Sequence, residues 1–310
     1  MKSHLPISFI IPAFNCAGTL VESVRSIIDS NLSRSDEIVI VNDGSTDNTA
    51  IVLERLERDY EFVHVVNHRR NKGGGAARNT AVENTQNDIL FCLDSDNLLA
   101  PGSIGPLIDY MQESRADSAC FQELHFFQGN PRQITHVWKF RPGEFTLADH
   151  LAGNVVPGAS GNYIFTKESW ARAGGYPEFA GALDTWGFGL RQLASGSKLM
   201  VMPDTYYLHR WGHDSYWIRD SSNLPNSLKA LQVIIPFLHL LEEEEVDYIF
   251  SKEGREVWLD LLKRPLRLKS GKIGQKGTII PHRKSLLFRL FLKRAIVRLT
   301  NIYKSNRVSF

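Results

Sequence analysis

Apolar and β-branched residues gather in short runs along the first hundred residues of the chain. The four clearest runs lie at residues 7–11, 37–41, 62–66 and 88–93. Three stretches with apolar residues at helical spacing separate them, at residues 19–30, 45–60 and 75–85. Uninterrupted apolar strands are typical of parallel sheets that are covered on both faces. The alternation therefore predicts a doubly wound α/β fold with helices on both faces of a mainly parallel sheet.

The second half of the chain is less regular. Strand-like runs lie at residues 118–127, 161–167 and 198–203. Residues 184–195 have a helical pattern, and from about Pro225 onward the chain becomes helical and amphipathic. We therefore expect an α/β domain over residues 1–224, followed by a C-terminal helical extension over residues 225–310.

The composition is that of an ordinary globular protein. The 310 residues are 43% hydrophobic and 23% charged, as in average soluble domains. The three cysteines, Cys16, Cys92 and Cys120, fit neither a disulfide framework nor a zinc pattern. The N-terminus lacks a signal-peptide pattern, and no apolar run reaches the roughly 20 residues of a membrane span. We expect a cytoplasmic protein.

Charge is distributed unevenly along the chain. After Asp260 there are 14 lysines and arginines and no Asp or Glu. Residues 1–260 contain 22 basic and 34 acidic residues, a net charge of −12. An acidic body with a basic tail indicates that the two parts have different roles.

Polar residues cluster where each of the first four predicted strands ends. The clusters are Pro12, Ala13 and Asn15; Asn42 and Asp43; Asn71, Gly73 to Gly75, Arg78 and Asn79; and Asp94, Ser95 and Asp96. In an open parallel sheet, ligands bind outside the carboxyl ends of the strands. We therefore expect the four clusters to form a single site.

Asp94 and Asp96 are two residues apart at the end of an apolar run. Residues at this spacing on a strand point the same way, so both carboxylates could face one cation. Carboxylates suit a hard divalent cation that also bridges phosphates. The alternative is a polar strand end leading into a turn, which Asp, Ser and Asn favour.

The usual nucleotide-binding loops are absent from the sequence. The first strand is not followed by G-x-G-x-x-G, the loop that brings a dinucleotide pyrophosphate onto a helix N-terminus, which argues against a dehydrogenase. The glycine-rich segment "NKGGGAARN" lacks G-K-[ST] and is therefore not a P-loop. Within the clusters, Asp43 could accept hydrogen bonds from a base or ribose, and Arg78 could face a base or phosphate.

The segments "NDGSTD" (42–47), "NKGGGAARN" (71–79) and Asp94-Ser95-Asp96 resemble glycosyltransferase family 2 in their order and spacing. The resemblance is dense over residues 7–101, thinner to about 215, and does not cover the C-terminal region. It implies a GT-A, Rossmann-like fold. The nucleotide-binding half is then residues 1–101 and the acceptor-binding half residues 102–224.

The same resemblance implies an activity, a cofactor and residue roles. The activity is inverting transfer of a sugar from a nucleotide diphosphate donor, a UDP-sugar, with Mn²⁺ or Mg²⁺. The acceptor is a glycan or lipid-linked molecule in surface polysaccharide or glycoconjugate synthesis. Asp43 contacts the base, Arg78 helps to hold the nucleotide, Asp94 faces the ribose or metal, and Asp96 ligates the metal. Nucleotide-binding positions are completed by Pro12, Ala13, Asn15 and Ser95.

An inverting transfer needs a carboxylate that accepts the proton of the attacking hydroxyl. The family usually supplies it from a Glu-Asp pair that opens a helix after a Gly-Gly-aromatic turn. Here Gly174-Gly175-Tyr176 matches the turn, but Asp184 is followed by Thr185, so only one acidic residue is present. We assign Asp184 as the base, with Glu178 as the reserve candidate. The alternative is that Asp184 is only a helix N-cap.

Residues downstream of this helix complete the candidate site. His209 could be a third metal ligand, with His213 as a weaker candidate. Trp186 and Trp211 could stack on sugar rings or belong to the core. Asn42 and Asn97 stand where acidic residues are common in the family, which leaves the donor's identity open.

Residues 285–304 in the basic tail have a helical pattern with basic side chains beside an apolar face. This pattern favours a peripheral helix at an anionic membrane on the cytoplasmic side, over a helix packed on the catalytic domain or a nucleic-acid contact.

Two other functions fit part of the sequence. One is a catalytically silent nucleotide- or glycan-binding protein, because the acidic pair at Asp184 is incomplete. The other is a sugar-phosphate nucleotidyltransferase. Such an enzyme would need a glycine-rich loop with an arginine directly after its first strand, and this sequence does not have one there.

Overall fold

The computed structural model describes residues 5–30, 32–152, 156–212 and 226–250. The chain divides into two units, residues 1–275 and 276–310, and every described residue belongs to the first. The expected boundary at residue 224 and the basic helix at 285–304 lie outside the described residues.

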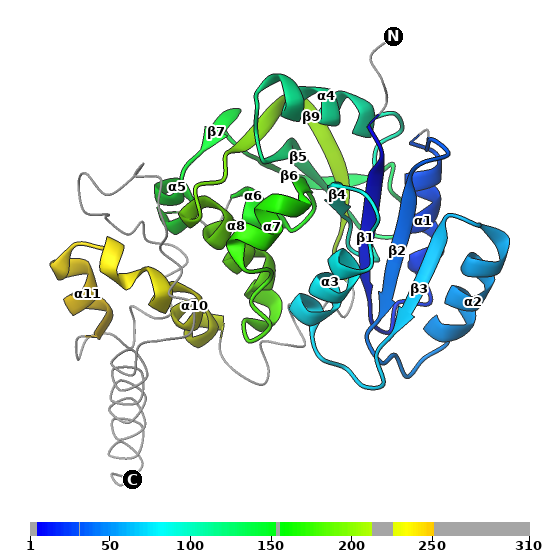
Figure 1. Ribbon diagram of the computed structural model, residues 1–310, viewed down its shortest axis with the longest axis horizontal. Helices are drawn as coiled ribbons and strands as arrows, with labels where there is room; N and C mark the ends of the chain where they lie inside the picture. The colour runs from blue at the N-terminus through cyan, green and yellow to red at the C-terminus, as the bar shows by residue number, and fades with distance from the viewer. Residues whose placement is uncertain (1–4, 31, 153–155, 213–225, 251–310) are drawn as a thin grey trace, which may run out of the picture. The chain divides into compact units, whose positions relative to one another are not determined.

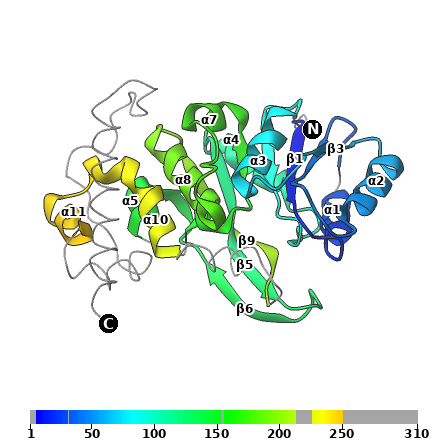
Figure 2. The same cartoon turned by 90° about the horizontal axis from the view of Figure 1, so that it is seen from below.

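The first half of the described unit is a parallel sheet. Its strands are β1 (Ile7–Ala13), β2 (Glu37–Asn42), β3 (Val63–Asn67) and β4 (Ile89–Cys92), in the order β3-β2-β1-β4. Its helices are α1 (Leu20–Ile28), α2 (Thr49–Asp59) and α3 (Gly74–Glu83). Figures 1 and 2 show α3 on one face and α1 and α2 on the other. The predicted arrangement of helices on both faces is confirmed.

The sheet continues through strands of mixed direction. Its path beyond β4 runs through β8 (Ile164–Thr166), β5 (Ser118–Phe127), β9 (Leu199–Arg210) and β7 (Gly143–Phe145). The short β8 is antiparallel to both β4 and β5, whereas β5 and β9 are parallel. A further strand, β6 (Ile134–Lys139), forms an antiparallel hairpin with β5. The sequence pattern did not predict β6 or β7, and it ended β9 seven residues early.

Helices accompany the second half of the sheet. They are α4 (Ile104–Glu113), α5 (Leu147–Ala152), α6 (Pro157–Ser160), α7 (Lys167–Ala173), the 3₁₀ turn η1 (Gly181–Leu183) and α8 (Asp184–Ala194). After the undescribed residues 213–225, the chain forms α10 (Asn226–Ile234), the 3₁₀ helix η2 (Ile235–Leu240) and α11 (Glu243–Phe250). In the described part of the chain, no helix combines the length and the apolar character needed to cross a membrane.

A ladder of aromatic rings crosses the core from the first strand to the ninth. Phe9 contacts Phe91, Phe91 contacts Phe121, and Phe121 contacts Tyr207, with ring centroids 6.0, 6.0 and 6.3 Å apart. All four side chains are buried. Burying apolar area of this kind is the main stabilising contribution to a sheet core. The ladder joins the two halves of the sheet and ends at Tyr207, whose hydroxyl group reaches the candidate site.

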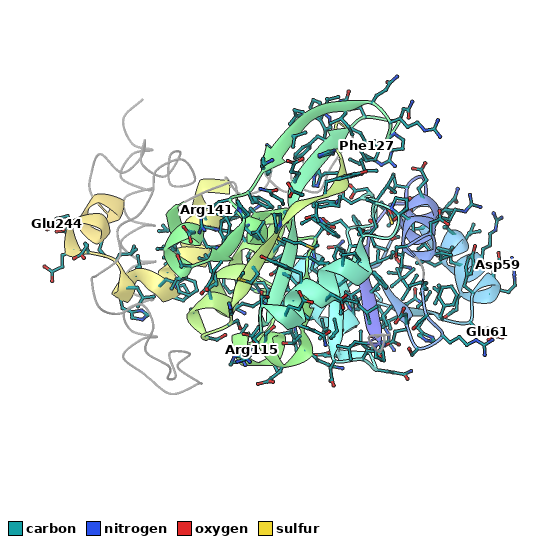
Figure 3. All side chains as sticks on the ribbon, turned by 90° about the horizontal axis from the view of Figure 1, so that it is seen from above. Asp59, Glu61, Arg115, Phe127, Arg141 and Glu244 are labelled. Carbon is teal, nitrogen blue, oxygen red and sulfur yellow. The ribbon has the colours of Figure 1, made fainter. Side chains whose placement is uncertain are left out.

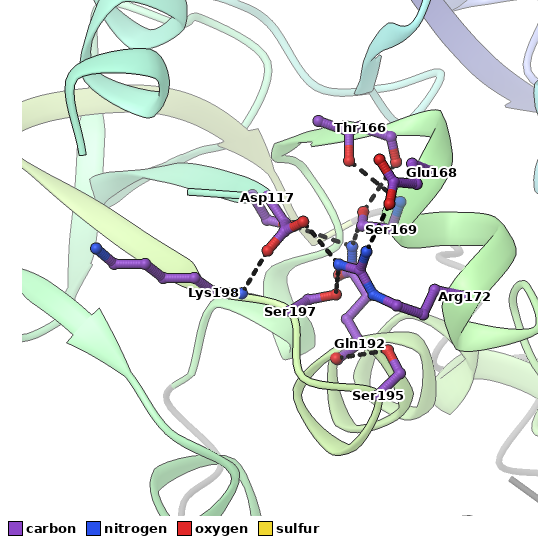
Figure 4. Close-up of polar contacts among 10 residues, drawn as sticks. Asp117, Thr166, Glu168, Ser169, Arg172, Gln192, Ser195, Ser197 and Lys198 are labelled. Carbon is purple, nitrogen blue, oxygen red and sulfur yellow. Dashed lines mark hydrogen bonds and ion pairs between the residues drawn. The ribbon is translucent and has the colours of Figure 1, made fainter. Parts of the chain in front are cut away.

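A polar network fixes helices α7 and α8 against the start of β5 (Figure 4). Arg172 of α7 donates to Asp117 Oδ1 at 2.6 Å and to Ser197 Oγ at 3.1 Å. Gln192 of α8 donates to the hydroxyl groups of Ser118 and Ser169, both at 2.9 Å. Because buried polar groups must be paired, this network restricts how α8 can sit. The helix that carries Asp184 therefore has a defined position.

Candidate active site

The carboxyl ends of β1, β2 and β4 meet at one edge of the sheet, as the sequence predicted. Asn15 follows β1, Asp43 follows β2, and Asp94 follows β4. Direct contacts connect the loops. The backbone N–H of Asp43 donates to Ala13 O at 2.8 Å, and Thr19 Oγ1 donates to Ser95 O at 2.9 Å. The predicted strand-end residues therefore form one continuous rim.

Both oxygens of the Asp94 carboxylate accept hydrogen bonds. Arg78 Nη2 donates to Oδ1 at 2.6 Å, and Asn162 Nδ2 donates to Oδ2 at 3.0 Å. Asn162 also accepts from the backbone N–H of Asp94 at 2.8 Å. Asn162 is completely buried, so this two-point contact holds the end of β4 in one geometry. Asn162 was not among the residues that the sequence singled out, because no motif marks an isolated asparagine before a short strand.

Arg78 joins the two halves of the site. It lies in α3, and its Nη1 donates to Asp184 Oδ2 at 2.7 Å while its Nη2 bonds Asp94. The guanidinium is buried and lies 5.8 Å from the centroid of the Tyr176 ring. Burial alone would lower the pKa of Arg78, but Asp184 and Asp94 raise it well above its usual range. One fixed cation therefore bridges two carboxylates that are 90 residues apart in the chain.

Asp184 is buried at the beginning of α8. It is the first residue of the helix and Leu183 is the N-cap, so the alternative in which Asp184 is only an N-cap is wrong. Burial raises the pKa of Asp184 to about 6, and the Arg78 cation opposes this shift. A carboxyl group with such a pKa is deprotonated near neutral pH and still basic enough to accept a proton.

The Gly174-Gly175-Tyr176 turn is held by Asn79 of α3 and by Arg191 of α8, whose Nη1 donates to Gly174 O at 3.2 Å and to Gly175 O at 3.0 Å. Asn79 Oδ1 accepts from the backbone N–H of Tyr176 at 2.8 Å, and Asn79 Nδ2 donates to Tyr176 O at 3.0 Å. Gly175 has φ +72°, and a Cβ atom there would lie 2.8 Å from Asn79 Oδ1. Glycine is therefore required at this position by both backbone conformation and space.

Glu178, the reserve candidate for the base, has a different environment from Asp184. Its side chain is exposed, and its Oε1 accepts from Asn79 Nδ2 at 3.1 Å. Gly75 at the start of α3 packs closely against this segment, because a Cβ atom there would lie 3.0 Å from Pro177 O and 3.3 Å from Asp184 Cβ. Both acidic candidates therefore lie beside the N-terminal turn of α3.

Asp43 is almost completely buried, and its carboxylate holds the glycine-rich loop. The backbone N–H groups of Lys72 and Gly73 donate to its two oxygens at 2.9 and 2.8 Å. His68 Nδ1 lies 2.6 Å from Asp43 Oδ1, and His68 Nε2 lies 3.0 Å from Thr80 Oγ1. Contact of Asp43 with a nucleotide base stays a prediction. The structure adds a second role, which is to fix the loop before α3.

Asn15 connects the loop after β1 to the loop after β2. Its Oδ1 accepts from the backbone N–H of Thr46 at 2.8 Å, and its own backbone N–H donates to Ser45 Oγ at 3.1 Å. Asn15 adopts φ 51°, which Asn tolerates better than most residues. The predicted nucleotide-binding residues of these two loops are therefore held in one arrangement.

The candidate metal ligands lie where the end of β9 meets the loop after β4. The backbone N–H of Arg210 donates to Asn97 Oδ1 at 2.9 Å, and Arg210 Nε donates to Asp96 O at 3.1 Å. His209 is the neighbouring residue, and its Nδ1 lies 3.3 Å from the Tyr207 hydroxyl, which Asn162 Nδ2 also contacts at 3.4 Å. Tyr207 and Asn162 thus connect His209 to Asp94.

The side chains of Asp96, His209 and Asp94 could bind a divalent cation only if the nucleotide diphosphate also supplied oxygen ligands. A carboxylate at Asp96 and an imidazole at His209 are suitable donors for Mn²⁺. The oxygens of Asp94, however, already accept from Arg78 and Asn162. Among the described residues, no three His, Cys, Asp or Glu side chains form a group that could hold a metal. Phosphate oxygens and water would complete the coordination, as they commonly do for Mg²⁺.

The two candidate sugar-stacking tryptophans have different environments. Trp186 is buried and its Nε1 donates to His150 O at 3.0 Å, so it belongs to the core. Trp211 is 39% exposed and lies directly after β9. His213 falls outside the described residues.

Comparisons with known proteins give one consistent result. A model of the family "Glycosyl transferase family 2" matches residues 8–174. The putative teichuronic acid biosynthesis glycosyltransferase TuaG of Bacillus subtilis is 33% identical over 152 residues, or 48% of this chain and 58% of TuaG. The poly(ribitol-phosphate) beta-glucosyltransferase of Bacillus spizizenii is 29% identical over 115 residues, or 36% of this chain and 18% of that protein. The matches thus span less than two thirds of either relative.

A solved structure supports the fold. Residues 1–349 of S. aureus TarS, in complex with UDP-GlcNAc, match with a TM-score of 0.58 and 16% sequence identity. The match covers 83% of this chain and 70% of that chain. The predicted α/β fold class is confirmed.

Proposed function

Because the chain belongs to glycosyl transferase family 2, we propose that it transfers a sugar from a nucleotide diphosphate donor with inversion at the anomeric carbon. The observation that carries the proposal is the Arg78 bridge between Asp94 and Asp184. It brings a strand-end carboxylate of the parallel sheet together with a buried carboxyl group of raised pKa. Perturbed acidic groups arranged around one cation are typical of catalytic sites.

In this proposal, Asp184 accepts the proton of the acceptor hydroxyl group as the oxygen attacks the anomeric carbon. Arg78 holds the Asp184 carboxylate in a fixed orientation, and Arg78 is held in turn by Asp94. A proton acceptor with a pKa of about 6 is matched to catalysis near neutral pH. Asp43 and Asn15 keep the loops that bind the nucleotide in place.

We propose Asp96, His209 and Asp94 as the residues that hold Mn²⁺ or Mg²⁺ together with the donor. Asp96 and His209 would supply direct ligands, and Asp94 would support them or contact the ribose. When bound, such a cation offsets the negative charge that develops on the leaving diphosphate.

The comparisons support a choice of substrates. UDP-GlcNAc is bound in TarS, which supports a UDP-sugar as donor. TuaG is named for teichuronic acid biosynthesis and the Bacillus spizizenii protein for poly(ribitol-phosphate), which supports a glycan or lipid-linked acceptor in surface polysaccharide synthesis. The 14 basic residues after Asp260 support a cytoplasmic protein that attaches peripherally to an anionic membrane surface.

The proposal is tested with the full-length chain and a panel of nucleotide sugars in the presence of Mn²⁺. Release of UDP from one or more UDP-sugars is expected, and Asp184→Asn should lower it by roughly 10² or more. Binding of UDP-sugars without turnover in the wild-type protein would instead indicate a catalytically silent binding protein. Absence of both binding and turnover would contradict the proposal.

A further inference from the structure

The β5–β6 hairpin and the end of β9 carry aromatic side chains that the proposed reaction does not use. Figure 2 shows this part of the sheet extending away from the helices, and in Figure 3 it forms an arch with Phe127 at the end of β5. All six residues of β6 are exposed. Two of the seven large apolar side chains that are exposed in the described part of the chain are Trp138, 38% exposed, and Trp211, 39% exposed.

The strand register shows which of these rings share a face of the sheet. Phe126 of β5 is paired with His136 of β6 on one side and with His209 of β9 on the other. In the next row, Leu124 is paired with Trp138 and with Tyr207. Directly paired residues point to the same face of a sheet. His136 and Trp138 therefore lie on the face that carries Tyr207 and His209.

Ring contacts make these residues into a continuous surface. The His136 ring stacks on Phe126 at a centroid distance of 4.2 Å and an angle of 11°, and Trp138 contacts Phe126 edge-on at 5.0 Å. Phe126 also contacts His209 at 4.7 Å, and His136 contacts Trp211 at 5.1 Å. Trp211 is fixed further, because its Nε1 donates to Thr135 Oγ1 at 2.8 Å. We call Phe126, His136, Trp138 and Trp211 the aromatic ledge.

The inner end of the ledge reaches the candidate active site. His209 lies 3.3 Å from the Tyr207 hydroxyl, Tyr207 contacts Asn162, and Asn162 bonds Asp94. A molecule lying on the ledge would therefore extend toward the residues proposed to bind the donor's diphosphate. A lipid bilayer or a second copy of the chain could bind an aromatic surface anywhere on the protein. The contacts that lead from this surface to Asp94 therefore favour a substrate as its occupant.

We propose that the aromatic ledge binds the acceptor saccharide. The apolar C–H faces of sugar rings pack against exposed tryptophan and histidine rings, and their hydroxyl groups can bond the imidazole nitrogens. Ligand sites commonly combine aromatic walls with a few polar groups in this way. The proposal rests on the function proposed above and adds the place where the saccharide part of the acceptor binds.

The test uses the full-length chain, an array of immobilised neutral, N-acetylated and acidic oligosaccharides, and UDP as a donor-site probe. Wild-type protein should bind one or more saccharide classes. Trp138→Ala and Trp211→Ala should each weaken that binding roughly tenfold, a larger effect than on UDP affinity. Trp138→Phe should restore part of the binding, because it keeps a ring at this position.

The chain offers a matched control on the same strands. Tyr206 is 41% exposed and stacks on His125 at a centroid distance of 4.4 Å. It is adjacent to Tyr207 in β9 and therefore points to the opposite face. Tyr206→Ala removes a ring of similar exposure and should leave saccharide and UDP binding unchanged.

Several results would overturn the proposal. One is that wild-type protein binds no saccharide on the array, and another is that the tryptophan variants bind as well as wild type. An equal loss in Tyr206→Ala, or an effect of the tryptophans on oligomeric mass or on binding to lipid vesicles instead, would also contradict it. Saccharide binding that depends on the tryptophans, in a chain that turns over no nucleotide sugar, would leave the ledge supported and the proposed transfer contradicted.

Discussion

The two halves of the sheet differ in the side chains that they place at the candidate site. In the first half these are polar groups bonded to neighbouring loops, and in the second half they are exposed aromatic rings. In the half built from β1 to β4, Asp43 and Asn15 accept hydrogen bonds from neighbouring loops, so their side chains fix the conformation of the site. In the half built from β5, β6 and β9, the rings of Trp138 and Trp211 are exposed and belong to the aromatic ledge. In the proposed function, the first half is a rigid donor side for the nucleotide, and the second half is an open acceptor side for a glycan.

The largest effect is expected at Asp96, the proposed metal ligand in the loop after β4. Asp96→Ala should lower transfer by roughly 10³, because losing a cation at the diphosphate forfeits several kcal/mol of transition-state stabilisation. Mn²⁺-dependent UDP binding should be lost as well, which calorimetry with and without Mn²⁺ measures. Glu61→Ala, which removes an exposed carboxylate in the turn before β3, is the control. Unchanged activity in Asp96→Ala would contradict the proposed metal site.

A substitution of Arg78, which bonds Asp94 and Asp184 together, should have the next largest effect. Arg78→Lys keeps a positive charge, but one ammonium group cannot reproduce the fixed fork that bonds Asp94 and Asp184 together. We expect kcat/KM to fall by roughly 10², with UDP affinity reduced less. Steady-state kinetics with a fixed acceptor and varied donor measures both. An equal reduction of UDP affinity and turnover would place Arg78 on the donor side alone.

The pH dependence of the reaction separates the two acidic candidates. Asp184 must be ionised to accept a proton, and its pKa is raised to about 6. The kcat/KM of wild-type protein should therefore rise about tenfold per pH unit below this value and level off above it. The rising limb should persist in Glu178→Gln and disappear from the residual activity of Asp184→Asn. A limb that disappears in Glu178→Gln instead would assign the base to Glu178.

The smallest effect concerns the rigidity of the Gly174-Gly175-Tyr176 turn, which directly follows α7. Gly175→Ala places a Cβ atom 2.8 Å from Asn79 Oδ1 at φ +72°, so both strain and a clash are expected. Gly129 has a similar φ, +65°, with nothing within 4 Å of the added Cβ. In urea unfolding, Gly175→Ala should lose about 2–3 kcal/mol and Gly129→Ala about 1 kcal/mol. Equal losses would show that Asn79 does not restrict the turn.

The same comparison explains what could be predicted from the sequence. Strand β2 contains the continuous apolar run of residues 38–41, and similar runs allowed β1 to β4 and their polar ends to be located from local pattern alone. Strand β6, by contrast, reads "ITHVWK" and is exposed along its whole length, so no apolar pattern marks it. Its position depends on pairing with β5, which is a tertiary contact.

The candidate site residues also divide into those that a local motif marks and those that only tertiary contacts reveal. Asp43, Arg78 and Asp94 could be chosen as candidates because they occur in motifs of known spacing, and their roles toward a nucleotide stay predictions. Asn162 and Tyr207 could not, because their importance comes from contacts with Asp94 and His209 that connect distant parts of the chain. The buried environment of Asp184, which raises its pKa, likewise depends on the packing of α3 against α8.

In the proposed sugar transfer from a nucleotide donor, Asp184 is the base and Arg78 holds it in place. The most direct measurement compares the turnover number and the UDP-sugar affinity of Asp184→Asn with those of Glu178→Gln, using the full-length chain. Asp184→Asn should lose roughly 10² or more in turnover and keep its donor affinity, while Glu178→Gln should stay close to wild type. Full turnover in Asp184→Asn, with loss of activity in Glu178→Gln, would contradict the assignment of Asp184 as the base.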